Sequence, residues 1–333
     1  MRICKKAESI FFIDFLTFLV NMPYLLGTML FTEKKMYIIE YSTVGFDESN
    51  YKKKIEEALN YLRMTDYKLG IQIHNSINKE FADKLTEYSN DLTFSVHSPA
   101  AGDYFLNLAS NQSELIFKEI DKAAKYLEKF NTDIFFFHGF FATDNPIQHS
   151  MKNYRTVMRD SIGEEIALDN SFTMNPAFFE TDKYRKFETC FCENYFKLKK
   201  LYPQYIVGLE NDFIGIGSCL QRPKEIDKLI DNLWFDLGHF WCSSLVHGFD
   251  YYKESYRLIE EKKIIGVHIN HNLMTKLDPI TRMRDSHDHI YKPCAQELEP
   301  VVRRLAKNGL KRFTLEIVDA DLLDIKTLIQ WLS

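Results

Sequence analysis

The sequence predicts an α/β fold of the (β/α)8 barrel class. After Met36, short apolar runs alternate with amphipathic stretches, which is the pattern of repeated strand-helix units around a parallel sheet. Eight such units can be counted, as a closed barrel requires. The structural alternative is a doubly wound open sheet. It is disfavoured because no GxGxxG follows the first strand and no GK[ST] phosphate loop occurs in the chain.

The strand candidates are short and regularly spaced. They are residues 37–41, 69–74, 92–97, 134–138, 206–210, 233–236, 264–269 and 313–318. Helical patterns between and after them include residues 114–130, 224–231, 251–261, 296–308 and 322–332. A long polar and aromatic segment, residues 141–184, interrupts this rhythm after the fourth strand. We expect it to form an elaborated loop over the barrel mouth, because long loops of this kind are commonly lids or binding surfaces.

Composition limits the class of protein but not its partner. With 333 residues, 45% of them hydrophobic, the chain can bury the core of one large α/β domain or two small ones. The formal net charge of -5 gives no overall attraction to nucleic acid or to an anionic membrane, although a local basic patch can coexist with it. Six cysteines without CxxC spacing indicate neither a zinc ribbon nor a disulfide framework. A reducing, cytoplasmic compartment fits best.

The amino terminus, residues 1–35, differs from the rest of the chain. Residues 10–31 are strongly apolar, yet Asp14, Asn21 and Pro23 interrupt them, and a spanning helix needs roughly 20 mostly apolar residues. No Ala-x-Ala cleavage site follows. We interpret this stretch as a loosely attached extension or a start-site artefact, with membrane attachment as the alternative and no stable insertion expected. The barrel then occupies residues 36–333.

Residue types that bind metals follow six successive strands, from the third to the eighth. These residues, with one on the helix after the sixth strand, are His97, His138, Glu210, Asp236, His239, His268 and Glu316. A single such residue is more often a hydrogen-bonded structural group than a ligand. An ionisable group on a barrel strand is costly unless it is paired or metal-bound, however, and the carboxyl ends of barrel strands converge on one mouth. The next loop adds Asp285 and His287, two residues apart, so that both can reach one ion.

The ligand chemistry and several short motifs point to a family. Mixed imidazole and carboxylate groups suit zinc, manganese or a similar divalent ion. The segments HSPAAGDYFLNLAS, GLENDFIGIGS, FDLGHF, VHIN, DSH and LEIV resemble motifs of endonuclease IV, the metal-dependent apurinic/apyrimidinic endonuclease within the xylose isomerase-like barrels. The resemblance runs from about Met36 to the end of the chain.

The resemblance implies a three-metal centre with up to three Zn²⁺ ions, Mn²⁺ being possible. His97 and His138 would hold one ion, which Glu210 would bridge to a second ion held by Asp236, His268 and Glu316. His239, Asp285 and His287 would hold the third ion. Divalent ions lower the pKa of bound water from about 15.7 to roughly 7, so such a centre can hydrolyse a phosphodiester. The implied partner is DNA with an abasic lesion, cleaved 5′ to that lesion after the damaged nucleotide leaves the helix.

The alternative is a sugar or sugar-phosphate isomerase or epimerase on the same barrel, with Glu210 and Glu316 as catalytic acid and base around one ion. Three departures from the endonuclease pattern put the DNA substrate in doubt. The fourth strand ends in HGF instead of His-Pro-Gly, and the residue that wedges into DNA has only Tyr104 or Phe105 as a counterpart. The 141–184 segment can also cover the groove that DNA must enter.

The remaining polar residues receive smaller roles. His74, His149, His247 and His271 are expected at the surface or behind the ligands. His289 competes with His287 for the third ion, and the family's Asp-x-His order favours His287. Asn211 and Asn270 are expected to orient neighbouring ligands. Six basic residues offer a phosphate track, although a solvated surface is the preferred interpretation: Lys152, Arg155, Arg159, Lys183, Arg185 and Lys186. The sequence does not indicate an oligomeric state.

Overall fold

Eight parallel strands form a closed barrel in chain order, so the predicted fold class is confirmed. The structure is a computed structural model and describes residues 36–333; the apolar extension 1–35 lies outside the described residues. The last strand closes the barrel by pairing with the first, with Ile39 beside Phe313 and Tyr41 beside Leu315. Within residues 36–333, no helix is both long and apolar enough to cross a membrane.

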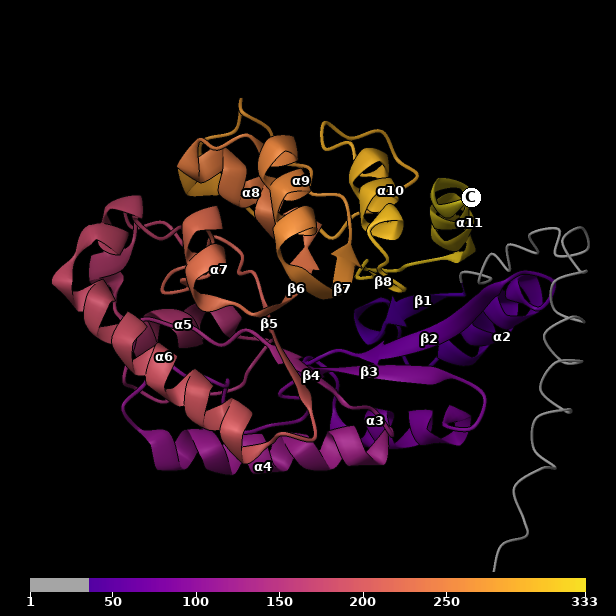
Figure 1. Cartoon of the computed structure of the whole chain (residues 1–333), viewed down its shortest axis with the longest axis horizontal. Helices are drawn as coiled ribbons and strands as arrows, with labels where there is room; N and C mark the ends of the chain where they lie inside the picture. Colours follow the sequence, from indigo (N-terminus) through magenta and orange to yellow (C-terminus); the bar gives the residue numbers. More distant parts are fainter. Residues whose placement is uncertain (1–35) are drawn as a thin grey trace, which may run out of the picture. The chain divides into compact units, whose positions relative to one another are not determined.

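The strands lie at the centre and the helices pack around them (Figure 1). The strands are β1 (Tyr37–Ser42), β2 (Tyr67–Ile73), β3 (Thr93–Ser98), β4 (Ile134–Phe137), β5 (Ile206–Glu210), β6 (Asn232–Asp236), β7 (Lys263–Ile269) and β8 (Arg312–Leu315). The α-helices are α2 (Tyr51–Leu62), α3 (Lys79–Leu85), α4 (Ser113–Lys129), α5 (Tyr154–Ile162), α6 (Asp182–Leu201), α7 (Pro223–Leu229), α8 (Leu237–His247), α9 (Tyr251–Glu261), α10 (Glu299–Lys307) and α11 (Leu322–Leu332).

Helix ends follow local capping chemistry. Asp250 caps α9 by accepting a hydrogen bond from the Lys253 N–H, and Asp321 and Asp324 form a capping box at the start of α11. Both helices have the bounds that the sequence predicts. The eighth strand instead ends at Leu315, three residues before the predicted end, because the chain turns away towards solvent near Asp319, whose φ is 62°.

Aromatic stacking fills the barrel below its mouth. The rings of Phe136 on β4 and Trp234 on β6 stack with centroids 3.7 Å apart. A Cβ atom at Gly266 on β7 would lie 2.4 Å from the Trp234 ring, so a glycine is required at this close approach. His97 and His268 lie against this stack, with their ring centroids 5.0 Å and 5.8 Å from that of Phe136. The polar mouth therefore has an apolar floor.

The 141–184 segment lies over the mouth, as the sequence predicts. It contains α5, and its Phe141 and Thr173 form bridges with Ser218 and Gly215 in the loop after β5. Several of its side chains line the cavity at the carboxyl ends of the strands. The segment thus covers the centre described next, and we call it the lid segment.

Candidate metal centre

Strand geometry brings the nine predicted residues together. Side chains two apart on a strand point the same way, so His138, Asp236 and His268 follow the inward-facing Phe136, Trp234 and Gly266 by two residues each. Their carboxyl-terminal positions place them one layer above the aromatic floor. The other predicted residues lie at the ends of β3, β5 and β8, in the first turn of α8, and in the loop between β7 and α10.

Glu210 lies at the middle of this cluster and is fully buried. Its Oε1 lies 2.8 Å from Nδ1 of His268 and 3.7 Å from Nδ1 of His239. Its Oε2 lies 3.4 Å from Nε2 of His97 and 3.7 Å from Nε2 of His138. One carboxylate thus faces four imidazoles, two through each oxygen, which is the arrangement a bridging ligand needs.

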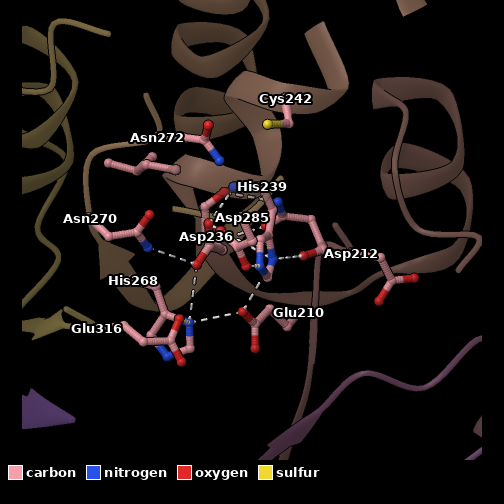
Figure 2. A network of polar contacts seen from close by, with 12 residues as sticks. Glu210, Asp212, Asp236, His239, Cys242, His268, Asn270, Asn272, Asp285 and Glu316 are labelled. Carbon is pink, nitrogen blue, oxygen red and sulfur yellow. Dashed lines mark hydrogen bonds and ion pairs between the residues drawn. The ribbon is translucent and has the colours of Figure 1, made fainter. Parts of the chain in front are cut away.

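Four of the residues form one compact, fully buried group (Figure 2). Nδ1 of His268 lies 3.1 Å from Oε2 of Glu316 and 3.4 Å from Oδ2 of Asp236, in addition to its contact with Glu210. The four ligand atoms of Glu210, Asp236, His268 and Glu316 all lie within 4.8 Å of one another. A nitrogen and three carboxylate oxygens at this spacing can surround one divalent cation.

A second group lies at the loop after β7. Oδ2 of Asp285 lies 2.9 Å from Nε2 of His239 and 2.7 Å from Nε2 of His287. His289, the competing residue, instead pairs with Asp324 through Nδ1 at 2.8 Å. The geometry thus brings His287, and not His289, to Asp285.

The imidazoles are held as metal-binding histidines usually are. Typically one ring nitrogen donates to a protein acceptor and the other faces the metal. Nδ1 of His239 contacts the Asn211 carbonyl oxygen at 3.0 Å, and Nδ1 of His287 contacts the Glu316 carbonyl oxygen at 2.8 Å. Two further rings also contact a protein acceptor through one nitrogen. Nδ1 of His138 lies 2.9 Å from Oδ1 of Asp212, and Nε2 of His268 lies 2.9 Å from Oε1 of Gln72.

Polar atoms without partners show that a cation would fit here. Within residues 36–333, Oε2 of Glu210, Nδ1 of His97 and Oδ1 of Asp285 are buried and form no hydrogen bond. A buried polar atom without a hydrogen bond costs roughly 1–3 kcal/mol. The carboxylates of Glu210 and Asp285 lie beside imidazoles, so a divalent ion would satisfy their free oxygens better than the protein alone does.

The electrostatic field of the cluster favours positive charge. Burial alone would lower the pKa of His268, but Glu210 and Glu316 outweigh it and raise that pKa well above its usual value. Burial would likewise lower the pKa of His287, yet Asp285 and Glu316 raise it to about 10. Burial and the neighbouring His138 and His74 instead hold the pKa of His97 well below its usual value. The field that stabilises protonated imidazoles also attracts a cation.

A cavity of about 320 Å³ opens above the centre. His97, His138, His239, Asp285, His287 and Glu316 line it, as do Phe141, Tyr154, Arg155 and Phe172 of the lid segment. Burial raises the pKa of the Tyr154 hydroxyl, which therefore stays neutral. The centre thus faces a small chamber with a largely aromatic roof.

The mouth excludes one of the two suggested wedge residues, and the suggested phosphate track fits the preferred interpretation of a solvated surface. Phe105 is only 6% exposed, because its ring packs against Tyr154 and His149 with centroids 5.9 Å and 4.8 Å away, so it cannot wedge into a duplex. Half of the suggested phosphate track is paired with carboxylates: Lys183 with Glu165, Arg185 with Asp182, and Arg159 with Glu164.

Sequence reasoning missed several polar neighbours of the ligands. Asp212 and Gln72 orient His138 and His268. His74, expected at the surface or behind the ligands, lies behind Glu316, with its Nε2 3.3 Å from Oε1 of that glutamate. Asp212 was identifiable from its place two residues after Glu210, whereas β2 carries no motif that marks Gln72. Asn211 and Asn270 behave as expected, since both hydrogen-bond to Asp236.

Comparisons with known proteins define the class of fold. No family model and no curated protein sequence matches the chain. Among solved structures, a D-tagatose 3-epimerase-like protein aligns with a TM-score of 0.53 and 17% identity, over 88% of this chain and 97% of that one. The TTHB071 protein from Thermus thermophilus, in a structure soaked with ZnCl2, aligns with a TM-score of 0.49 and 12% identity, over 89% and 97% of the two chains. The described residues have the xylose isomerase-like barrel fold.

Proposed function

We propose that this protein is a divalent-metal-dependent isomerase or epimerase that acts on a sugar or sugar phosphate. The observation that carries the proposal is the pair of buried glutamates, Glu210 and Glu316, which contact the same atom, Nδ1 of His268, at 2.8 Å and 3.1 Å beside a small cavity. A cavity of about 320 Å³ is in the range used for small molecules. The D-tagatose 3-epimerase-like neighbour supports this class of substrate by its name.

The residues of the cluster have complementary tasks in such a reaction. One glutamate removes the proton from a carbon next to the substrate carbonyl, and the other returns a proton to that carbon from its opposite face or to the adjacent carbon. Asp236 and His268 complete the ligand set with these glutamates. A divalent ion held there supplies polarisation of the substrate oxygens. The aromatic rings of Tyr154 and Phe172 exclude water from the chamber.

A three-metal phosphodiesterase of the endonuclease IV type is the second candidate. The specific observation in its favour is the group of His239, Asp285 and His287, which a single-ion isomerase does not need. The approach of His97 and His138 to Oε2 of Glu210 adds a further pair of ligands. Against this candidate stand the buried Phe105 ring and the lid segment across the mouth.

One experiment separates the two candidates. Protein loaded with Mn²⁺ or Zn²⁺ is incubated with ketoses, aldoses and their phosphates in D2O, and both product formation and deuterium incorporation are followed by NMR. A duplex with one abasic-site analogue is tested in parallel. We expect sugar interconversion with deuterium incorporation that is lost in Glu210→Gln and Glu316→Gln.

Glu119→Gln is the matched control, because Glu119 is a buried glutamate on α4 that is not among the predicted ligands. Its activity should equal that of the wild-type protein. Incision of the duplex without any sugar turnover would refute the isomerase proposal and favour the second candidate.

A further inference from the structure

The carboxyl end of β2 contributes two cavity residues that the proposed chemistry does not use. His74 and Asn75 directly follow this strand, line the same cavity as the predicted ligands, and are only 8% and 3% exposed. Neither belongs to the nine residues that the endonuclease resemblance implies. Two buried polar side chains that border an open chamber need a reason for their position.

His74 faces the chamber as a hydrogen-bond donor. Its Nδ1 accepts a hydrogen bond from the backbone N–H of Ser76 at 3.2 Å, so in the neutral ring the proton resides on Nε2. That Nε2 lies 3.3 Å from Oε1 of Glu316. The imidazole therefore presents an N–H group beside the glutamate, and it does not present a lone pair for a metal.

Asn75 provides an acceptor beside this donor. Its Oδ1 is buried and has no hydrogen-bond partner within residues 36–333, while its Nδ2 lies 3.4 Å from Nε2 of His97. The ring of His74 lies 5.3 Å from that of His97, so the two polar groups border the same part of the chamber. A buried amide oxygen without a donor is destabilising, and a ligand hydroxyl would supply the missing donor.

We infer that His74 and Asn75 form a hydroxyl-binding subsite for neighbouring hydroxyl groups of a polyol chain. Nε2–H of His74, which lies 3.3 Å from Oε1 of Glu316, donates to one substrate oxygen in a hydrogen bond shared with that glutamate, and Oδ1 of Asn75 accepts from the next hydroxyl. The aromatic lid residues Tyr154 and Phe172 offer an apolar surface to the carbon skeleton. This inference rests on the proposed function and deepens it, because it makes the hydroxyl groups next to the reacting carbons the recognised part of the substrate.

The test measures binding of xylitol, a polyol with no carbonyl group, to Mn²⁺-loaded protein by isothermal titration calorimetry. We expect the wild-type protein to bind xylitol and Asn75→Leu and His74→Phe each to weaken binding about tenfold or more, the effect of losing a hydrogen bond and leaving its partner unpaired. His74→Gln, which keeps an N–H donor, should recover part of the loss. Glu119→Gln changes a buried glutamate that does not line this cavity and should change the affinity less than about threefold.

The outcomes separate this inference from the proposed function. Metal content and thermal unfolding of each variant establish that it is folded and loaded. Unchanged xylitol affinity in folded Asn75→Leu, or no xylitol binding by the wild-type protein, overturns the subsite even if sugars are interconverted. Xylitol binding that depends on both residues, in a protein that turns over no sugar, supports the subsite and refutes the isomerase chemistry.

Discussion

Two fully buried glutamates, Glu40 on β1 and Glu210 on β5, have different surroundings in the same barrel. The carboxylate of Glu40 is satisfied by the chain itself, because Ser95 and Thr314 donate to it at 2.9 Å and 2.7 Å and Arg312 forms an ion pair with it. Glu210 has imidazoles around both oxygens and an Oε2 without a hydrogen bond from any described residue. Both glutamates are therefore buried charges, but only Glu210, at the mouth, has a carboxylate oxygen without a hydrogen bond from the described residues.

The physical lesson concerns where the compensating charge comes from. Arg312 lies at the start of β8, so the Glu40 pair belongs to the barrel interior below the mouth, where stabilising the fold is the expected role. At Glu210, the neighbouring His138 and His268 have their other ring nitrogens fixed by protein acceptors. The first arrangement stabilises the fold, and the second is prepared for a cation from solution.

The largest expected effect is on turnover. Glu210→Gln keeps the shape of the side chain but removes an acid-base group and a charged ligand, so we expect sugar interconversion to fall about 10²–10⁴-fold. Metal content per chain should fall in the same variant. Glu40→Gln should keep the activity of each folded molecule, and an equal loss of activity in both variants would abolish the distinction between the two glutamates.

The next effect is on stability. Glu40→Gln leaves the partly exposed Arg312 without its partner, so we expect the free energy of unfolding to fall by about 3 kcal/mol, as for a broken buried ion pair. Urea denaturation followed by circular dichroism measures the change. Unaltered metal content should accompany the loss. A Glu40→Gln protein as stable as the wild-type protein would show that the pair contributes nothing.

Metal removal should lower the thermal stability through the ligands at the barrel mouth, and not through the Glu40 ion pair. An ion present at about 100 times its dissociation constant stabilises the folded state by about 2.7 kcal/mol, so chelation should lower the melting temperature by several degrees. The Glu40→Gln protein should show the same decrease, and Glu210→Gln a much smaller one. Equal decreases in all three proteins would place the stabilising ion elsewhere.

The smallest effect is a pH dependence from a histidine away from the centre. Burial and the nearby Arg222 lower the pKa of His247 to about 4, whereas the mouth histidines have anionic neighbours. His247 binds a proton below about pH 6.5 in the unfolded chain but only below about pH 4 in the folded chain. The folded state is therefore destabilised relative to the unfolded state as the pH falls from about 6.5 to about 4. In the wild-type protein we expect this effect to lower the free energy of unfolding by roughly 1–2 kcal/mol over that pH range, and in His247→Gln we expect it to be absent. Urea unfolding at several pH values measures the difference. If the free energy of unfolding changed with pH equally in His247→Gln and the wild-type protein, this prediction would be wrong.

The sequence was informative where local patterns determine structure. Strand-helix alternation predicted all eight strands, and the residues after the strands predicted which side chains meet at the mouth. It could not show how the charge of Glu40 is satisfied, because the partner of Glu40, Arg312, is 272 residues away. Gln72 and Asn75 were missed for a related reason, since only the closed barrel brings β2 beside the ligands of β3, β7 and β8.

The most direct test of the central claim is anomalous X-ray scattering from crystals of the zinc- or manganese-loaded protein. We predict a metal peak enclosed by Glu210, Asp236, His268 and Glu316. A second peak at His239, Asp285 and His287 would strengthen the phosphodiesterase candidate, and its absence would favour the isomerase. No peak at the four-residue group in metal-loaded crystals would contradict the assignment of the barrel mouth as a metal centre.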